Sequence, residues 1–114
     1  MNYARSSERR WTPETAIAHV RERLAEQGRG CVDEAGRCHY IMADGRRCAV
    51  GWLLTEAEAW EAERRGLHAT DLKLPVALVA ELRAAHDDAT AGEFAEDLDF
   101  ELSRLSARWS DDAP

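Results

Sequence analysis

Apolar side chains recur every three or four residues in four stretches of this 114-residue chain. In the first stretch Ile17, Val20 and Leu24 share one face, and in the last Leu98, Leu102 and Leu105 do so. This spacing is typical of amphipathic helices that bury one side. The pattern predicts helices over about residues 13–27, 55–65, 75–88 and 91–109.

Residues that favour helix ends support several of these boundaries. Thr12 stands before a proline, which suits an N-cap followed by the first helical position. Thr55 and Glu58 match a capping box at the start of the second helix. Gly28 and Gly66 follow the first and second helices, where glycine readily takes the left-handed conformation that ends a helix.

The stretch 38–54 has a different pattern and predicts a β-hairpin that runs into a helix. A three-residue loop over 43–45, with its glycine in the left-handed region, pairs Tyr40 with Cys48. A two-residue turn at the same place would pair Ile41 with Cys48 instead. The longer loop is favoured because it separates two faces, as a half-buried hairpin requires.

In the favoured register the face predicted to be buried carries Cys38, Tyr40, Met42, Cys48 and Val50. The face predicted to be exposed carries His39, Ile41, Arg47 and Ala49. A lone hairpin is only marginally stable in water, so helices should cover its apolar face. The expected fold class is therefore α+β, with about four helices packed around a single two-stranded hairpin. Residues 1–11 are expected to form a flexible tail and residues 12–110 a single domain.

No apolar run approaches the roughly 20 residues of a membrane span. The first residues lack the apolar core of a secretory signal. These two features predict a cytoplasmic protein that does not bind membranes. Three cysteines, an odd number, then indicate free thiols or a metal site rather than a disulfide framework.

The formal net charge of −7 is concentrated at the C-terminal end. Residues 1–80 carry equal numbers of acidic and basic residues, so residues 81–114 hold the whole excess. Such a segment disfavours direct nucleic-acid binding and favours a basic protein surface as partner. The residues predicted to bind that partner lie on the last helix, where an aromatic is surrounded by acids: Glu93, Glu96, Asp97, Phe100 and Glu101. The alternative is that a second copy covers this aromatic in a homodimer.

The hairpin region carries a recognisable motif. It begins with Cys-x-Tyr at Cys38 and Tyr40 and continues with a glycine turn followed by two basic residues, Gly45, Arg46 and Arg47. It ends with Cys-Ala-Val-Gly-x-Leu-Leu, which comprises Cys48, Ala49, Val50, Gly51, Leu53 and Leu54. Over residues 13–109 the chain resembles a family of small uncharacterised proteins encoded by bacteriophages and by bacterial genomes that carry prophages. His86-Asp87 matches the His-Asp that ends a later helix in that family, whereas Ile41 and Thr55-Glu56 depart from its pattern. The resemblance implies a phage or prophage setting and no particular mechanism.

Two kinds of chemistry could use the cysteines. A structural zinc could be held by Cys38, Cys48 and His86, with Cys31 or Asp87 as a fourth ligand, although no close cysteine pair of the usual zinc spacing is present. Alternatively, Cys48 at a helix start could be a nucleophile with His86 as base and Asp87 as its orienting acid. The competing interpretation is that both cysteines and His86 are core residues, the histidine bonded to a carbonyl or to Tyr40.

These observations favour a non-catalytic protein that needs no cofactor. The expected function is that of a phage or prophage accessory protein, which binds a host protein through its acidic last helix. It would act as an anti-defence (anti-CRISPR-like) inhibitor or a nucleic-acid mimic. The alternative is a small thiol- or zinc-dependent enzyme centred on Cys48 and His86.

Overall fold

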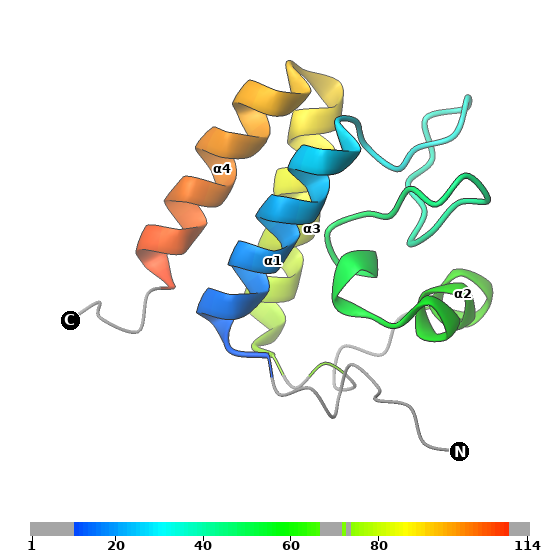
Figure 1. Ribbon diagram of the computed structural model, residues 1–114, viewed down its shortest axis with the longest axis horizontal. Coiled ribbons are helices and arrows are strands. Elements are labelled where there is room, and N and C mark those ends of the chain that lie inside the picture. Colours follow the sequence, from blue (N-terminus) through cyan, green and yellow to red (C-terminus); the bar gives the residue numbers. More distant parts are fainter. Residues whose placement is uncertain (1–10, 67–71, 73, 110–114) are drawn as a thin grey trace.

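The computed structural model describes residues 11–66, 72 and 74–109, and its regular elements are all helical (Figure 1). Helix α1 spans Pro13–Gln27, α2 spans Glu56–Arg65, α3 spans Val76–Ala91 and α4 spans Phe94–Arg108, with a short 3₁₀ helix, η2, at Gly51–Leu53. The described part of the chain contains no β-strand. The fold is therefore all-α, and the predicted α+β architecture around a hairpin is wrong.

The helices themselves lie close to their predicted positions. The Thr12 hydroxyl accepts the backbone N–H of Thr15 at 3.1 Å, and the Thr55 hydroxyl accepts that of Glu58 at 3.1 Å. Helix α1 ends at Gly28, whose φ is 78°. Because these caps satisfy the free backbone groups of helix ends with neighbouring residues, the sequence alone locates them.

The connection between α3 and α4 differs from the prediction. Helix α3 continues to Ala91 and α4 begins only at Phe94. The carboxylate of Asp97 accepts the backbone N–H of Glu93 at 2.9 Å, which caps the start of α4 from within the helix. The turn between the two helices has the predicted length of two residues, but it lies three residues later than the apolar pattern indicates.

Helix α4 packs against both α3 and α1, and these three helices enclose part of the hydrophobic core (Figure 1). The buried stripe of α4 consists of the predicted Leu98, Leu102 and Leu105. On the other side of α1, η2 packs against α1 and α2, and the segment between α1 and η2 lies alongside them. Trp11, the last residue of the predicted tail, donates its indole N–H to the Leu53 carbonyl at 3.0 Å. The remainder of that tail lies outside the described residues.

The segment 28–50 contains two isolated β-bridges in place of the predicted hairpin. One pairs Ile41 with Arg47, and the Cys48 N–H reaches the Tyr40 carbonyl at 3.4 Å. This is the register of the three-residue loop, with φ of 94° at Gly45, so the predicted register is confirmed. The pairing ends at Cys48 because its carbonyl accepts the Trp52 N–H as the chain turns into η2.

The predicted division into a buried and an exposed face is wrong. Ile41 and Ala49, expected on the exposed face, are buried, whereas Cys38 is exposed. Cys38 does not lie opposite Val50, because it forms the second bridge with Val32. Since the pleat is not sustained, burial here no longer alternates along the chain.

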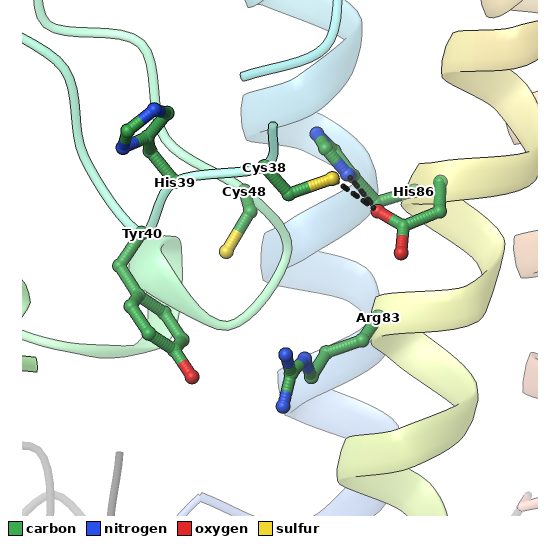
Figure 2. A pocket seen from close by; sticks show the side chains of 7 residues that line it. Cys38, His39, Tyr40, Cys48, Arg83 and His86 are labelled. Carbon is green, nitrogen blue, oxygen red and sulfur yellow. Dashed lines mark hydrogen bonds and ion pairs between the residues drawn. The ribbon is translucent and has the colours of Figure 1, made fainter. Parts of the chain in front are cut away.

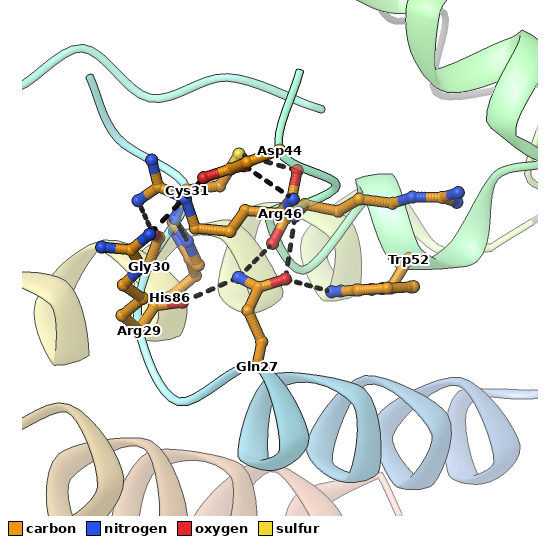
Figure 3. Close-up of polar contacts among 9 residues, drawn as sticks. Gln27, Arg29, Gly30, Cys31, Asp44, Arg46, Trp52 and His86 are labelled. Atoms are coloured by element: carbon orange, nitrogen blue, oxygen red, sulfur yellow. Dashed lines mark hydrogen bonds and ion pairs between the residues drawn. The ribbon is translucent and has the colours of Figure 1, made fainter. Parts of the chain in front are cut away.

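The side-chain amide of Gln27 forms hydrogen bonds with the backbone of segment 28–50 of the kind that a neighbouring strand would form (Figure 3). Its Oε1 accepts the Arg47 N–H at 2.9 Å, and its Nε2 donates to the Arg47 carbonyl at 3.0 Å. The same amide accepts the Trp52 indole N–H at 3.1 Å and donates to the Arg29 carbonyl at 2.7 Å. One side chain at the end of α1 therefore satisfies backbone groups that a strand would otherwise pair.

Gly51 permits a close approach between η2 and the segment before it. A Cβ atom at this position would lie 2.0 Å from the backbone oxygen of Tyr40. A backbone atom cannot yield as the end of a flexible side chain can, so any larger residue would separate the two segments.

Candidate functional site

A small pocket of about 50 Å³ lies between the segment 28–50 and α3 (Figure 2). It is lined by Cys38, His39, Tyr40, Cys48, Arg83, His86 and Asp87. The fold thus brings together most of the residues proposed from the sequence for chemistry. His39, Tyr40 and Arg83 were not proposed as ligands or catalytic residues, and Arg83 lies over the Tyr40 ring, 5.7 Å from its centre.

His86 is held at both ring nitrogens. Its Nε2 accepts the backbone N–H of Cys31 at 2.9 Å, and its Nδ1 lies 3.0 Å from Oδ1 of Asp87. Because Nε2 must accept, the ring proton belongs on Nδ1, which donates it to the carboxylate. The prediction of a core histidine is confirmed by its 1% exposure, but its partners are an N–H and a carboxylate rather than a carbonyl or Tyr40.

The thiols of the two pocket cysteines, Cys38 and Cys48, both have a raised pKa. The Cys38 thiol donates to Oδ1 of Asp87 at 3.1 Å, and burial, together with this carboxylate, raises its pKa to about 11. Cys48 is buried and its Sγ accepts the Gly51 N–H at 3.3 Å, yet desolvation raises its pKa to about 11 as well. Both side chains are therefore neutral thiols near pH 7 when no metal is bound.

The residues of the predicted catalytic triad share this pocket without the hydrogen bonds of a triad. Asp87 orients His86 as expected. The second nitrogen of His86, however, is used by the Cys31 N–H and not by Cys48. A histidine without an available nitrogen cannot take a proton from a nucleophile. The geometry therefore gives no support to the thiol-enzyme alternative.

The structure does bring several of the predicted metal ligands close together. One ligand atom from each of Cys38, His86 and Asp87 lies within 4.8 Å of the other two. Cys48 lines the same pocket, whereas Cys31 donates its thiol to the Arg46 carbonyl at 3.3 Å. Asp87 is thus the better placed of the two fourth ligands considered from the sequence.

His39 forms an ionic link that sequence reasoning did not identify. Its Nδ1 lies 2.5 Å from a carboxylate oxygen of Glu63 in α2, and its Nε2 lies 2.9 Å from that of Asp33. The hydrogen bonds to Asp33 and then to Glu63 raise the pKa of His39 above its ordinary value. No short-range pattern signals this link, because Glu63 is 24 residues away.

The outer face of α4 holds the residues predicted to bind a partner. Glu93, Glu96 and Phe100 lie on one face by helical spacing, and all three are exposed, Phe100 to 65%. Asp97 is half-buried because it caps the helix start, and Glu101 is mostly covered and pairs with Arg104 at 2.7 Å. We call Glu93, Glu96 and Phe100 the α4 outer face.

Charged groups that flank the buried stripe of α4 form ion pairs with α1 and α3. Asp99 forms an ion pair with Arg21 of α1, and Arg108 pairs with Glu81 of α3 at 2.6 Å. Trp109 also donates its indole N–H to Glu81, at 2.8 Å. Helix α4 therefore holds its outer face in a fixed orientation.

A second, open groove of about 430 Å³ lies between the end of α1 and the turn at residues 44–46 (Figure 3). Three arginines line it, but each contacts a carboxylate of this chain. Arg23 lies 3.4 Å from Glu26, while Arg29 and Arg46 lie 3.5 and 2.8 Å from Asp44. Because the acids offset the arginines, the groove is a poor site for an anion.

Among the described residues, no helix combines the length and apolar character needed to cross a bilayer. Comparison of the whole chain with known proteins gives no match to a family model, a curated protein or a solved structure.

Proposed function

We propose that this chain is a non-catalytic binding protein whose α4 outer face docks onto a basic surface of another protein. The observation that supports the proposal most strongly is Phe100, a large apolar side chain that is 65% exposed. It stands on the same face as Glu93 and Glu96, neither of which forms an ion pair among the described residues.

This arrangement favours a partner with a hydrophobic pocket surrounded by arginine or lysine. Full burial of a phenylalanine side chain contributes about 1.5–3 kcal/mol. The flanking carboxylates would accelerate association with a basic surface and exclude acidic competitors. Aromatic anchors of this kind commonly supply most of the binding energy in a small interface.

The proposed setting follows from the motif at residues 38–54 and the charge of the last helix. We place the protein in the cytoplasm, encoded by a phage or prophage, with a host protein as its partner. A host protein that normally binds nucleic acid offers a basic surface, so the acidic face would act as a nucleic-acid mimic. Inhibition of a defence protein in this way would make the chain an anti-defence protein of the anti-CRISPR type.

The pocket chemistry supports a binding role over catalysis. Cys48 is buried with a raised pKa, and both nitrogens of His86 have partners. A weakly nucleophilic thiol without a free base provides no evident route to acyl transfer. We therefore assign the proposed function to α4 and not to the pocket.

The test is affinity capture from bacterial host lysate with three versions of the chain. The wild type should capture a specific basic protein, and Glu93→Lys/Glu96→Lys should lose it. The control Glu22→Lys/Glu34→Lys changes two exposed acids elsewhere by the same charge and should retain the partner. Capture that survives the α4 reversal, or a wild type that captures nothing specific, would refute the proposal.

A further inference from the structure

The exposed side of α4 changes its charge along the helix. The α4 outer face is acidic and ends at Phe100. The next two turns present three more exposed residues on the same side by helical spacing: Ser103, Arg104 and Ala107. We call these three the α4 C-terminal face. The side of the helix that faces away from the core is therefore acidic before Phe100, and after it carries one arginine between small residues.

Helix α4 lies at one edge of the molecule, which makes this side accessible (Figure 1). Its inner side packs against α3 and α1. Phe100, in the middle of the helix, is 65% exposed. Aromatic side chains are enriched in protein interfaces, where the ring is removed from water. An occupant that matches the whole of this side must offer an apolar contact at its centre and opposite charges on either side of that contact.

A second copy of α4 meets both requirements when it runs antiparallel. In two antiparallel helices that cross at Phe100, a residue before Phe100 on one copy faces the residue equally far after it on the other. Glu96 then faces Arg104 of the second copy, and two-fold symmetry repeats the pair on the other side of the crossing. A parallel arrangement would instead bring like charges together, which repel.

The side chains near the crossing also complement one another. The Cα–Cβ bonds of a helix tilt toward its N-terminus, so each Phe100 ring leans toward the acidic half of its own helix. In the antiparallel pair this direction leads to Ser103 and Arg104 of the second copy. Serine leaves room for the ring, and a guanidinium can lie against an aromatic face while it pairs with a carboxylate.

Arg104 is available for such a contact. Its side chain is 66% exposed, and it forms a surface ion pair at 2.7 Å with Glu101 of the same helix. Surface pairs of this kind contribute little to stability. The guanidinium can therefore turn toward a second copy at small cost to the fold.

We propose that the free protein forms a symmetric dimer in which two α4 helices pack antiparallel about Phe100. A contact through one helix of each copy lies at or below the lower end of the range of about 1,200–2,000 Å² for stable interfaces, so the dimer is weak and reversible. It does not rest on the proposed function, because it needs this chain alone. It adds a consequence to that function, since the host protein can bind only a chain that has left the dimer.

Sedimentation velocity on the purified full-length chain, from low micromolar to millimolar concentration, tests the dimer without any other protein. The wild type should change from monomer to dimer over this range, and Phe100→Ala should weaken dimerisation at least tenfold. A wild type that stays monomeric at the highest concentration would overturn the proposal. A wild type that forms larger assemblies would do so as well, because a two-fold contact closes at two copies.

Charge reversal tests the antiparallel register. Glu96→Arg and Arg104→Glu should each weaken self-association at least tenfold, because each places like charges opposite one another. An equimolar mixture of the two variants should form a heterodimer with about the wild-type Kd, since both pairs of opposite charges are restored. The control Arg37→Glu reverses an exposed charge in the segment 28–50 and should dimerise like the wild type. Single variants that dimerise normally, a mixture that stays monomeric or a control that loses the dimer would refute the register.

The variant Arg104→Glu also separates this inference from the proposed function. It should remove the dimer but make α4 more acidic, so it should still capture the basic host protein. Capture that is lost together with the dimer would mean that the host protein binds the dimer, and it would overturn the mutual exclusion. A wild type that dimerises but captures nothing specific would support the dimer and refute the proposed function alone.

Discussion

Replacing Gln27 by alanine should detach the segment 28–50 from the end of α1. The amide of Gln27 makes four hydrogen bonds, two to the backbone of Arg47, one to Arg29 and one to Trp52. Each such bond contributes a net 0.5–1.5 kcal/mol as an order of magnitude. The side chain is half-buried, so water would replace some of them, and we expect a loss of about 2–3 kcal/mol.

Urea unfolding followed by tryptophan fluorescence measures this loss directly. Gln27→Glu keeps both accepting bonds but places a carboxylate oxygen against two carbonyls, so it should destabilise at least as much as alanine. The matched control is Glu26→Ala, an exposed neighbour whose removal should change the free energy of unfolding by less than about 0.5 kcal/mol. A Gln27→Ala protein within about 0.5 kcal/mol of the wild type would refute the reasoning.

Two further predictions concern stability. Gly51→Ala, which places a Cβ 2.0 Å from a backbone oxygen, should cost more than about 3 kcal/mol or prevent folding. Gly45→Ala meets no atom within 4 Å but has φ of 94°, so it should cost only about 1–2 kcal/mol; equal losses in urea unfolding would contradict this account. Because the folded-state pKa of His39 is raised above 6.5, its two carboxylate bonds should contribute fully below pH 6.5 and fade as pH rises through the folded value. His39→Gln should therefore remove a stability decline that the wild type shows as the pH rises above 6.5, and identical pH profiles for the two proteins would count against it.

The helices could be predicted from sequence because their determinants are local. Threonine caps, terminal glycines and leucine spacing all act within a few residues, and α1 and α2 lie close to their predicted positions. The start of α4 was misplaced because its cap, the Asp97 carboxylate, acts from inside the helix.

The hairpin was overpredicted because a correct local register does not make a strand. The turn at Gly45 and the Ile41–Arg47 bridge follow the sequence pattern. What stabilises this segment, however, is the Gln27 amide, 20 residues before Arg47, and no short-range pattern reveals it. The burial of Ile41 and the exposure of Cys38 do not follow the alternation that a strand would give.

The sequence was sufficient to predict which residues gather at the candidate site, but not which hydrogen bonds they form. The sequence identified Cys38, Cys48, His86 and Asp87, and all four line one pocket. The Cys31 N–H, 55 residues away, occupies Nε2 of His86 and so leaves the ring proton on Nδ1. The difference between a catalytic base and an orienting donor therefore comes from the fold.

The most direct test of the proposed function compares two single variants against the captured partner. Phe100→Ala should remove about 2 kcal/mol of binding, or roughly 30-fold in Kd, whereas Cys38→Ala in the pocket should leave Kd unchanged. Isothermal titration calorimetry with purified partner provides both values. The opposite result, in which Phe100→Ala binds normally and Cys38→Ala does not, would contradict the assignment of function to α4.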